Sequence, residues 1–323
     1  MKALLIMFFL PVAIGLSGCS SEKDTDDTSV VADTDTDSDT DTDKGFVELT
    51  VGDTHNCARK SDGAVQCWGN NSQKQTEPPE GIAFQALSTG VWQSCGLDVD
   101  GAVHCWGCEG NDLGQCDGLE GTYSAIAVGS YHGCAIDLSG AISCWGCEDL
   151  RDFGQCDAPS GNYTTIAASD QHTCAIDTDG KVNCWGCGRD DQGQCGSRDA
   201  NFVALDAGGS HTCGITDSDE MLCWGSDKFG ALNVPSGEWA ALGTGHVHSC
   251  GVTTDGQLMC WGCEAEGPEP DQGQCESPEG GIYQQVGGGT GHGCALSTEG
   301  TIDCWGCGDD WKWDVGQCEA PAP

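Results

Sequence analysis

The chain has 323 residues, and its 50 glycines, 25 cysteines and 11 tryptophans fit no average globular domain. Such a bias is typical of repeat proteins or disulfide scaffolds. Acidic residues outnumber basic ones by 51 to 12, which gives a formal net charge of −39. Because nucleic-acid binding depends on Lys and Arg displacing counterions from phosphates, this charge argues against DNA and RNA as partners.

The first residues have the pattern of an export signal. Met1-Lys2 is a short positive start, residues 3–15 are apolar but too few to span a bilayer comfortably, and LSGC ends the stretch at Cys19. This ending resembles a bacterial lipobox, which implies cleavage before Cys19 and a lipid on its thiol. We therefore expect residues 1–18 to be a lipoprotein signal peptide and the mature protein to be an outer-membrane lipoprotein, facing the cell surface or the periplasm. A plain secretory signal is the alternative.

Residues 19–45 form an acidic Asp/Thr-rich segment, with ten acids and two lysines after Cys19. Its apolar content is too low to offset chain entropy and its like charges repel, so we predict a disordered stalk. The Asp-x-Asp pattern also suggests loose calcium binding, but the segment lacks the turn glycine and bidentate Glu of a calcium loop.

The rest of the chain, residues 46–323, contains seven copies of one unit. Each copy has the sequence CWG preceded by another cysteine ten residues earlier, and the copies recur every 37 to 44 residues. A fixed period near forty indicates a repeat architecture. The paired cysteines are Cys57 and Cys67, Cys95 and Cys105, Cys134 and Cys144, Cys174 and Cys184, Cys213 and Cys223, Cys250 and Cys260, and Cys294 and Cys304.

Short alternating segments and turn signals predict an all-β fold. In the fourth copy, a hairpin with the turn TDG places Ile176 opposite Val182 and Cys174 opposite Cys184, within disulfide reach. The fifth copy alone has DSD, ending at Asp219, in place of a turn with glycine. Units of this length commonly hold four short strands, so we predict a seven-bladed β-propeller, with an open solenoid as the rival.

The repeated run of F/Y-x-x-I/L, then H-x-C-A-I/L, a D/E-G turn, C-W-G and G-Q resembles the regulator of chromosome condensation repeat. That resemblance implies a seven-bladed propeller. The chain departs from the pattern in its short repeats, its many cysteines, and the loss of GQ in the first and fifth copies.

A second cysteine pair follows CWG in five copies and is absent as a unit from the first and fifth. Loss as a unit implies bonding as a unit, so we predict two disulfides in each complete copy and Cys19 left unpaired. Zinc sites and redox-active thiols are the less favoured alternatives. The second pairs are Cys108 and Cys116, Cys147 and Cys156, Cys187 and Cys195, Cys263 and Cys275, and Cys307 and Cys318.

Six histidines precede the first cysteine of their copies. We expect each to hold its own blade by hydrogen bonds, although six imidazoles around an axis also suggest a metal site. We expect the seven CWG tryptophans to pack in the core. The histidines are His55, His132, His172, His211, His248 and His292, and the tryptophans are Trp68, Trp106, Trp145, Trp185, Trp224, Trp261 and Trp305.

The sequence shows no nucleophile motif or phosphate-binding loop, and we assign no catalytic residue, metal or cofactor. The favoured function is binding or scaffolding at the cell surface, with an unidentified protein or glycan as partner and Cys19 as the membrane anchor. The first alternative is a hydrolase or lyase of an envelope polymer, which predicts carboxyl groups with raised pKa in the channel or a rim cleft. Guanine-nucleotide exchange follows from the family name only, and export argues against it; a purely structural surface protein also fits. Candidate binding residues are Trp92, His104, Trp239, His246, Trp311 and Trp313.

Overall fold

The computed structural model describes residues 45–110, 112–147, 152–188, 191–263, 272–308 and 314–323, which all belong to one compact unit, Asp41–Pro323. The predicted signal peptide, Cys19, nearly the whole predicted stalk, Trp311 and Trp313 lie outside these residues and stay predictions. None of the described segments is a helix of the length and apolarity needed to cross a membrane.

The described residues form 21 strands. In chain order these are β1 (Phe46–Val51), β2 (His55–Lys60), β3 (Val65–Gly69), β4 (Phe84–Thr89), β5 (Gln93–Asp98), β6 (Val103–Gly107), β7 (Tyr123–Val128), β8 (Gly133–Asp137), β9 (Ile142–Trp145), β10 (Tyr163–Ala168), β11 (Thr173–Asp177), β12 (Val182–Trp185), β13 (Phe202–Ala207), β14 (His211–Thr216), β15 (Met221–Gly225), β16 (Trp239–Thr244), β17 (Ser249–Thr253), β18 (Leu258–Trp261), β19 (Tyr283–Gly288), β20 (Gly293–Ser297) and β21 (Ile302–Trp305).

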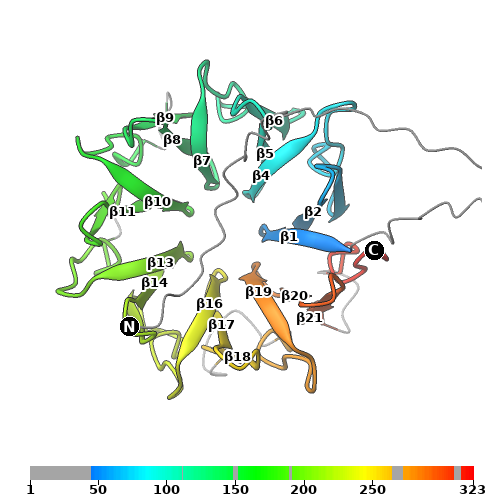
Figure 1. Ribbon diagram of the computed structural model, residues 1–323, viewed down its shortest axis with the longest axis vertical. Coiled ribbons are helices and arrows are strands. Elements are labelled where there is room, and N and C mark those ends of the chain that lie inside the picture. Colours follow the sequence, from blue (N-terminus) through cyan, green and yellow to red (C-terminus); the bar gives the residue numbers. More distant parts are fainter. Residues whose placement is uncertain (1–44, 111, 148–151, 189–190, 264–271, 309–313) are drawn as a thin grey trace, which may run out of the picture. The chain divides into compact units, whose positions relative to one another are not determined.

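The strands form seven antiparallel sheets, each built from three consecutive strands. The sheets stand as blades around a central axis, with the first strand of each blade innermost (Figure 1). The predicted seven-bladed propeller is therefore confirmed. The expected four strands per unit are not confirmed. Each blade has three strands among the described residues, because the residues after the third strand form turns and, in five blades, the second disulfide.

The second and third strands of each blade form a hairpin whose register matches the sequence prediction. In blade four, Cys174 pairs with Cys184 and Ile176 with Val182 across β11 and β12. The turn closes through Gly180, which has a φ of 78°. In blade five Asp219 takes the same place with a φ of 62°, a left-handed conformation that suits glycine better.

All twelve predicted disulfides are present, seven across the hairpins and five in the loops that follow CWG. The Cα atoms of Cys174 and Cys184 lie 4.0 Å apart, whereas those of Cys187 and Cys195 lie 6.2 Å apart. A chain with twelve disulfides belongs in an oxidising environment outside the cytoplasm.

The hydrophobic core lies between neighbouring blades. The first-strand aromatic of each blade packs against the CWG tryptophan of the same blade, as where the rings of Phe84 and Trp106 lie 5.6 Å apart. Both belong to one core cluster with Cys57 of the preceding blade. The predicted core role of the CWG tryptophans is confirmed, since all seven are at most 9% exposed.

Main-chain hydrogen bonds repeat between blades and close the ring. The amide of Phe84 donates to the carbonyl of the turn residue Gly63 in blade one, at 2.9 Å. The equivalent bond from Phe46 in blade one to Gly300 in blade seven is 2.8 Å long. Blades one and seven thus meet like any other neighbours, which the open solenoid would not allow (Figure 1).

The repeated histidines join neighbouring blades, rather than holding their own blades as expected. His172 Nε2 lies 3.0 Å from the hydroxyl of Thr212, one blade further on. His55, His132, His211 and His292 make equivalent contacts with Ser94, Thr173, Ser249 and Asn56. The exception is His248, because the next blade has Gly293, which offers no side chain.

The glycine and glutamine of the GQ pair are not lost together in the two variant copies. Copy one keeps the glutamine as Gln75, and Lys74 replaces the glycine with a φ of 62°. Copy five keeps Gly230, with a φ of 80°, but has Ala231. The glutamine carbonyl accepts from the tryptophan of the next blade, as in Gln75 with Trp106 Nε1 at 2.9 Å, and Ala231 serves Trp261 equally well. The main chain makes this bond, so the side chain can vary.

Candidate functional site at the mouth of the channel

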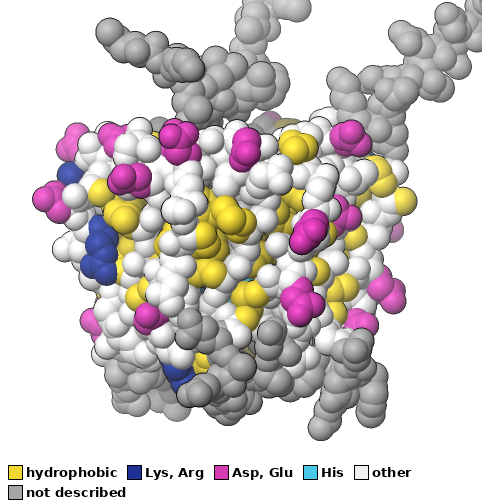
Figure 2. Space-filling model, turned by 90° about the horizontal axis from the view of Figure 1, so that it is seen from below, with side chains coloured by type: hydrophobic (Ala, Val, Ile, Leu, Met, Phe, Trp, Pro, Cys, Tyr) yellow, Lys and Arg dark blue, Asp and Glu magenta, His cyan; other side chains and the backbone are white. Residues whose placement is uncertain are grey.

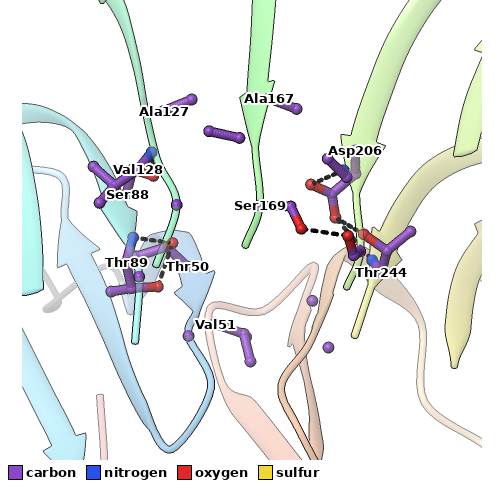
Figure 3. A pocket seen from close by; sticks show the side chains of 18 of the residues that line it. Thr50, Val51, Ser88, Thr89, Ala127, Val128, Ala167, Ser169, Asp206 and Thr244 are labelled. Atoms are coloured by element: carbon purple, nitrogen blue, oxygen red, sulfur yellow. Dashed lines mark hydrogen bonds between the residues drawn. The ribbon is translucent and has the colours of Figure 1, made fainter. Parts of the chain in front are cut away.

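The innermost strands enclose a cavity of about 320 Å³ on the propeller axis. It is lined by the final residues of the seven strands and by the loops that follow them. Figure 3 shows that these side chains come from several blades and are small or polar. A polar cavity shared by all blades is a natural place for a ligand to contact a propeller.

Side chains rather than a main-chain ladder connect the innermost strands. Thr50 and Thr89 share a hydrogen bond 2.9 Å long, and Ser88 Oγ accepts from the amide of Val128 at the same distance (Figure 3). Asp206 Oδ2 accepts from the amide and hydroxyl of Thr244, at 2.7 and 3.0 Å. Burial raises the pKa of Asp206, and these two bonds oppose the shift.

One loop residue per blade surrounds the mouth of this cavity. The residue that follows each innermost strand is a glycine in six blades and Ser169 in blade four, and the loop residue meant here is the next one in the chain. Its residue type differs from blade to blade, except that aspartate occurs twice. We call these seven residues the mouth ring: Asp53, Val91, Ser130, Asp170, Gly209 and His246, which line the cavity, and Thr290, whose amide donates to the carbonyl of Asp53.

Two aspartates of the mouth ring have opposite pKa shifts. Burial raises the pKa of Asp53 to about 6, and the negative charge of Asp170 adds to the shift, while His246 and a hydrogen bond from Thr290 oppose it. Burial would also raise the pKa of Asp170, but hydrogen bonds with His246 and Ser130 outweigh it and leave the pKa below its ordinary value. Asp53 is therefore partly protonated near pH 6 while Asp170 is ionised.

His246 reaches Asp170 across blade five. Its Nδ1 lies 3.4 Å from Asp170 Oδ2, and the two side chains are 34% and 30% exposed. Gly209 lies between them in the ring, and a Cβ atom there would come within 2.7 Å of His246 Nδ1. The glycine thus leaves the space that the imidazole occupies.

A second, smaller cavity adjoins His246 on the same face. It has a volume of about 140 Å³ and lies between blades five and six, lined by His246, Ser210, Lys228 and Phe229 among others. Blade five lacks the second disulfide here, and its loop instead presents Lys228, whose ammonium lies 4.9 Å from the Phe229 ring centroid. A ligand at the mouth would thus meet carboxylates and hydroxyls on one side of His246 and a cation on the other.

This arrangement suits polar ligands and proton transfer. A pair of carboxyl groups whose surroundings drive their pKa values apart is the usual basis of an acid and a base. No group of three or more His, Cys, Asp or Glu side chains with metal-binding geometry occurs within the described ranges.

The structure places the sequence-predicted binding residues in different environments. His246 lies in the mouth ring, and half-buried Trp92 follows the mouth-ring residue of blade two on the same face. His104 lies on the outermost strand β6, where its Nε2 contacts Asp98 at 2.8 Å and lowers the pKa of that carboxyl. The prediction of Trp239 as an exposed binding residue is wrong. Its side chain is 2% exposed, because it is the first-strand aromatic of blade six and packs on Trp261.

Sequence reasoning missed Asp53 and Asp170. A signal was available, since both occupy a position of the GxxH segment whose residue type changes from copy to copy. Their meeting depends on ring closure, which brings blades one, four and six to one mouth.

Five segments of the chain match the family model described as the Regulator of chromosome condensation (RCC1) repeat. They cover residues 46–75, 123–155, 163–194, 202–231 and 240–267. No curated protein sequence matches the chain.

Solved structures with a similar fold include two plant receptor ectodomains. The CRINKLY WD40 ectodomain of the receptor kinase ACR4 from Arabidopsis thaliana is 23% identical, with a TM-score of 0.65 over 81% of this chain and 97% of that one. The ectodomain of receptor kinase CR4 from Physcomitrella patens is 23% identical, with a TM-score of 0.67 over 81% and 73%. Prp20p from Saccharomyces cerevisiae is 17% identical, with a TM-score of 0.60 over 76% and 80%. At these identities the similarity establishes the propeller fold alone.

Proposed function

We propose that this protein is an extracytoplasmic binding module, anchored to the outer membrane through lipid on Cys19, whose propeller presents its channel mouth to a protein or glycan. The twelve disulfides fit a location outside the cytoplasm. An acidic spacer between Cys19 and the first blade would separate the propeller from the lipid surface by repulsion along the chain.

The observation that carries this proposal is the mouth ring. The repeated histidines, cysteines and tryptophans hold the blades together. Asp53, Asp170 and His246 of the mouth ring differ from the residues at the same position in most other blades, and their side chains make no contact that is repeated around the ring. Exposed polar groups in loops on a rigid scaffold are where binding residues are expected. The half-buried Trp92 and Tyr131 lie next to the ring in sequence and add aromatic surface on the same face.

The proposal predicts that partners contact the mouth face and not the opposite rim. Photo-crosslinking p-benzoyl-phenylalanine is placed at Trp92 or Tyr131, and for comparison at Asp100 or Asp179, which are exposed in the hairpin turns at the other ends of the blades. Irradiation of intact cells that express the full chain should give crosslinked partners from the first two positions only. Crosslinks solely from the turns would show that the other rim binds.

The lipid anchor is tested separately. If Cys19 carries the lipid, cells that express Cys19→Ala should no longer incorporate radiolabelled palmitate into the protein.

A second candidate function is cleavage of an envelope polymer, which the opposite pKa shifts of Asp53 and Asp170 favour. In this reaction Asp53 would donate a proton to the leaving oxygen while ionised Asp170 activates water or stabilises positive charge. Activity would fall as the pH rises through about 6, because Asp53 loses its proton. The test is release of new reducing ends from purified peptidoglycan by the full chain. Equal release by wild type, Asp53→Asn and Asp170→Asn would exclude this role.

A further inference from the structure

The outermost strand of blade six, β18, has an unpaired edge. Its register is fixed by the main-chain bond from Thr253 to Gln257 and by the Cys250–Cys260 pair, whose Cα atoms lie 4.0 Å apart. A pair this close is the non-hydrogen-bonded kind, in which amide and carbonyl point away from the partner strand. By alternation, the amides and carbonyls of Leu258 and Cys260 both face outward.

These outward groups border a groove. A groove of about 730 Å³ runs beside β18, lined by residues 257–260 of the strand, by the linker residues 275–281 and by Pro235. None of the outward amides and carbonyls of Leu258 and Cys260 bonds any described residue. The linker thus passes beside the edge without pairing with it, and no strand of the described residues occupies the fourth place.

The groove combines apolar and acidic side chains. Leu258 and Met259 line it and are half-buried, with their side chains on opposite faces of β18, while Glu276 and Glu279 are exposed on the linker. Figure 2 views the ring from the side on which β18 lies in Figure 1 and shows hydrophobic side chains at mid-height with acidic side chains around them and few basic ones. The surface therefore attracts an apolar chain that carries positive charge.

We propose that this groove binds an extended, lysine- or arginine-containing segment of another protein, which adds to β18 as a fourth strand. The main chain of the segment would pair with Leu258 and Cys260, its apolar side chains would cover Leu258 on one face of the sheet, and its cations would meet Glu276 and Glu279. A second copy of this chain is disfavoured as the occupant, because its net charge of −39 would bring like charges together. This site lies on the outer side of the ring and is independent of the mouth proposed above.

The test measures fluorescence anisotropy of a labelled Lys-Val-Lys-Val-Lys-Val peptide on the detergent-extracted full chain. Comparison peptides are the same sequence with alternate main-chain nitrogens methylated, and Glu-Val-Glu-Val-Glu-Val. We expect methylation to weaken binding by about tenfold or more, since it removes several ladder bonds. The acidic peptide should not bind.

Two variants locate the site. Leu258→Pro removes an outward amide that makes no hydrogen bond to β17. The double variant Glu276→Lys/Glu279→Lys reverses two exposed charges whose side chains make no described contact across the groove. Each should weaken peptide binding about tenfold, whereas Val65→Pro, at the equivalent place in β3 of blade one, should not. Far-ultraviolet circular dichroism checks folding.

Three results would overturn the proposal. If the methylated peptide binds as tightly as the parent, the interaction is ion pairing and not strand addition. If the variants bind like wild type, the peptide lies elsewhere. If sedimentation shows a dimer that Leu258→Pro dissociates, the edge pairs with a second copy and not with a basic partner segment.

Discussion

Trp68 Nε1 donates a hydrogen bond of 3.0 Å to the carbonyl of Gln317, although 249 residues separate the two in sequence. Asn56 Nδ2 donates to the same carbonyl at 2.9 Å. Both donors are buried in blade one, and the acceptor lies in the last residues of the described chain. The same bond joins Trp145 to Gln115 in the ordinary way within the ring. The two ends of the propeller are thus held together by the contact that joins every other pair of neighbours.

Removal of the last ten residues should therefore destabilise blade one and lower the free energy of unfolding. Deletion of residues 314–323 in a Cys307→Ser background leaves two buried donors without their acceptor, at about 1–3 kcal/mol each. We expect the free energy of unfolding to fall by about 2–5 kcal/mol relative to full-length Cys307→Ser/Cys318→Ser, which lacks the same disulfide but keeps Gln317. Urea titration followed by tryptophan fluorescence measures the difference. Equal stabilities would mean that the carbonyl of Gln317 does not hold the ring.

The turn of blade five provides a test of backbone strain. Asp219 has a φ of 62° where six blades have glycine, and its carbonyl accepts from the amide of Trp239. Asp219→Gly should raise the free energy of unfolding by about 0.5–1 kcal/mol, because the left-handed conformation is nearly free of strain for glycine. The rise in melting temperature is the readout.

The matched control for that substitution is Asp179→Gly in blade four. There Gly180 already holds the left-handed position, so a second glycine adds only unfolded-state entropy and should lower the stability slightly. If Asp219→Gly destabilises as much as Asp179→Gly does, the aspartate carries no strain in the turn.

Much of the fold was predictable from local signals repeated seven times. The alternation of Cys174 and Ile176 with Cys184 and Val182 fixed the hairpin register, and the joint loss of two cysteines from copies one and five fixed the disulfide pairing. The strand number was not predictable in this way. A unit of about forty residues usually holds four strands, but here the last residues of each unit form the tight turn whose carbonyl meets the tryptophan of the next blade.

Contacts between copies explain the remaining errors. The partner of His172 is Thr212, forty residues later, and no pattern within one repeat identifies a bond to the next. Trp239 was misjudged because tryptophan is unusual at the first-strand position, which the other copies fill with Phe or Tyr. The meeting of Asp53, Asp170 and His246 needs the closed ring and is invisible in any single copy.

Buried histidines between blades should make the protein sensitive to acid. Burial lowers the pKa of His211 to about 4, whereas in the unfolded chain it takes up a proton below about 6.5. The unfolded state therefore binds more protons between these pH values, and the contribution of His211 is complete above pH 6.5 and lost as the pH falls towards 4. At pH 5 that loss is about 2 kcal/mol for this one side chain.

The substitution His211→Gln separates this effect from the lost bond to Ser249. At pH 7 the variant should be less stable than wild type by about 1 kcal/mol, and the gap should close or reverse at pH 5 because glutamine does not titrate. Gln93→Ala is the control, since Gln93 joins blades two and three through the carbonyl of Gly129 without a titrating group. Its deficit should stay constant with pH, and a constant deficit for His211→Gln as well would contradict the assignment.

Gly209 leaves room for the His246 imidazole beside Asp170, and this contact helps to keep the Asp170 carboxylate ionised. A Cβ atom there would lie 2.6 Å from the carbonyl oxygen of His246 and 2.7 Å from its Nδ1, so Gly209→Ala must push the imidazole away from Asp170. Without that hydrogen bond, burial dominates and the pKa of Asp170 should rise above its value in the wild type, as measured by the carboxyl ¹³C chemical shift during a pH titration. Gly237→Ala is the matched control, because its nearest neighbour is 3.7 Å away. An unchanged Asp170 titration in Gly209→Ala would show that Ser130, and not His246, sets the charge of this carboxylate.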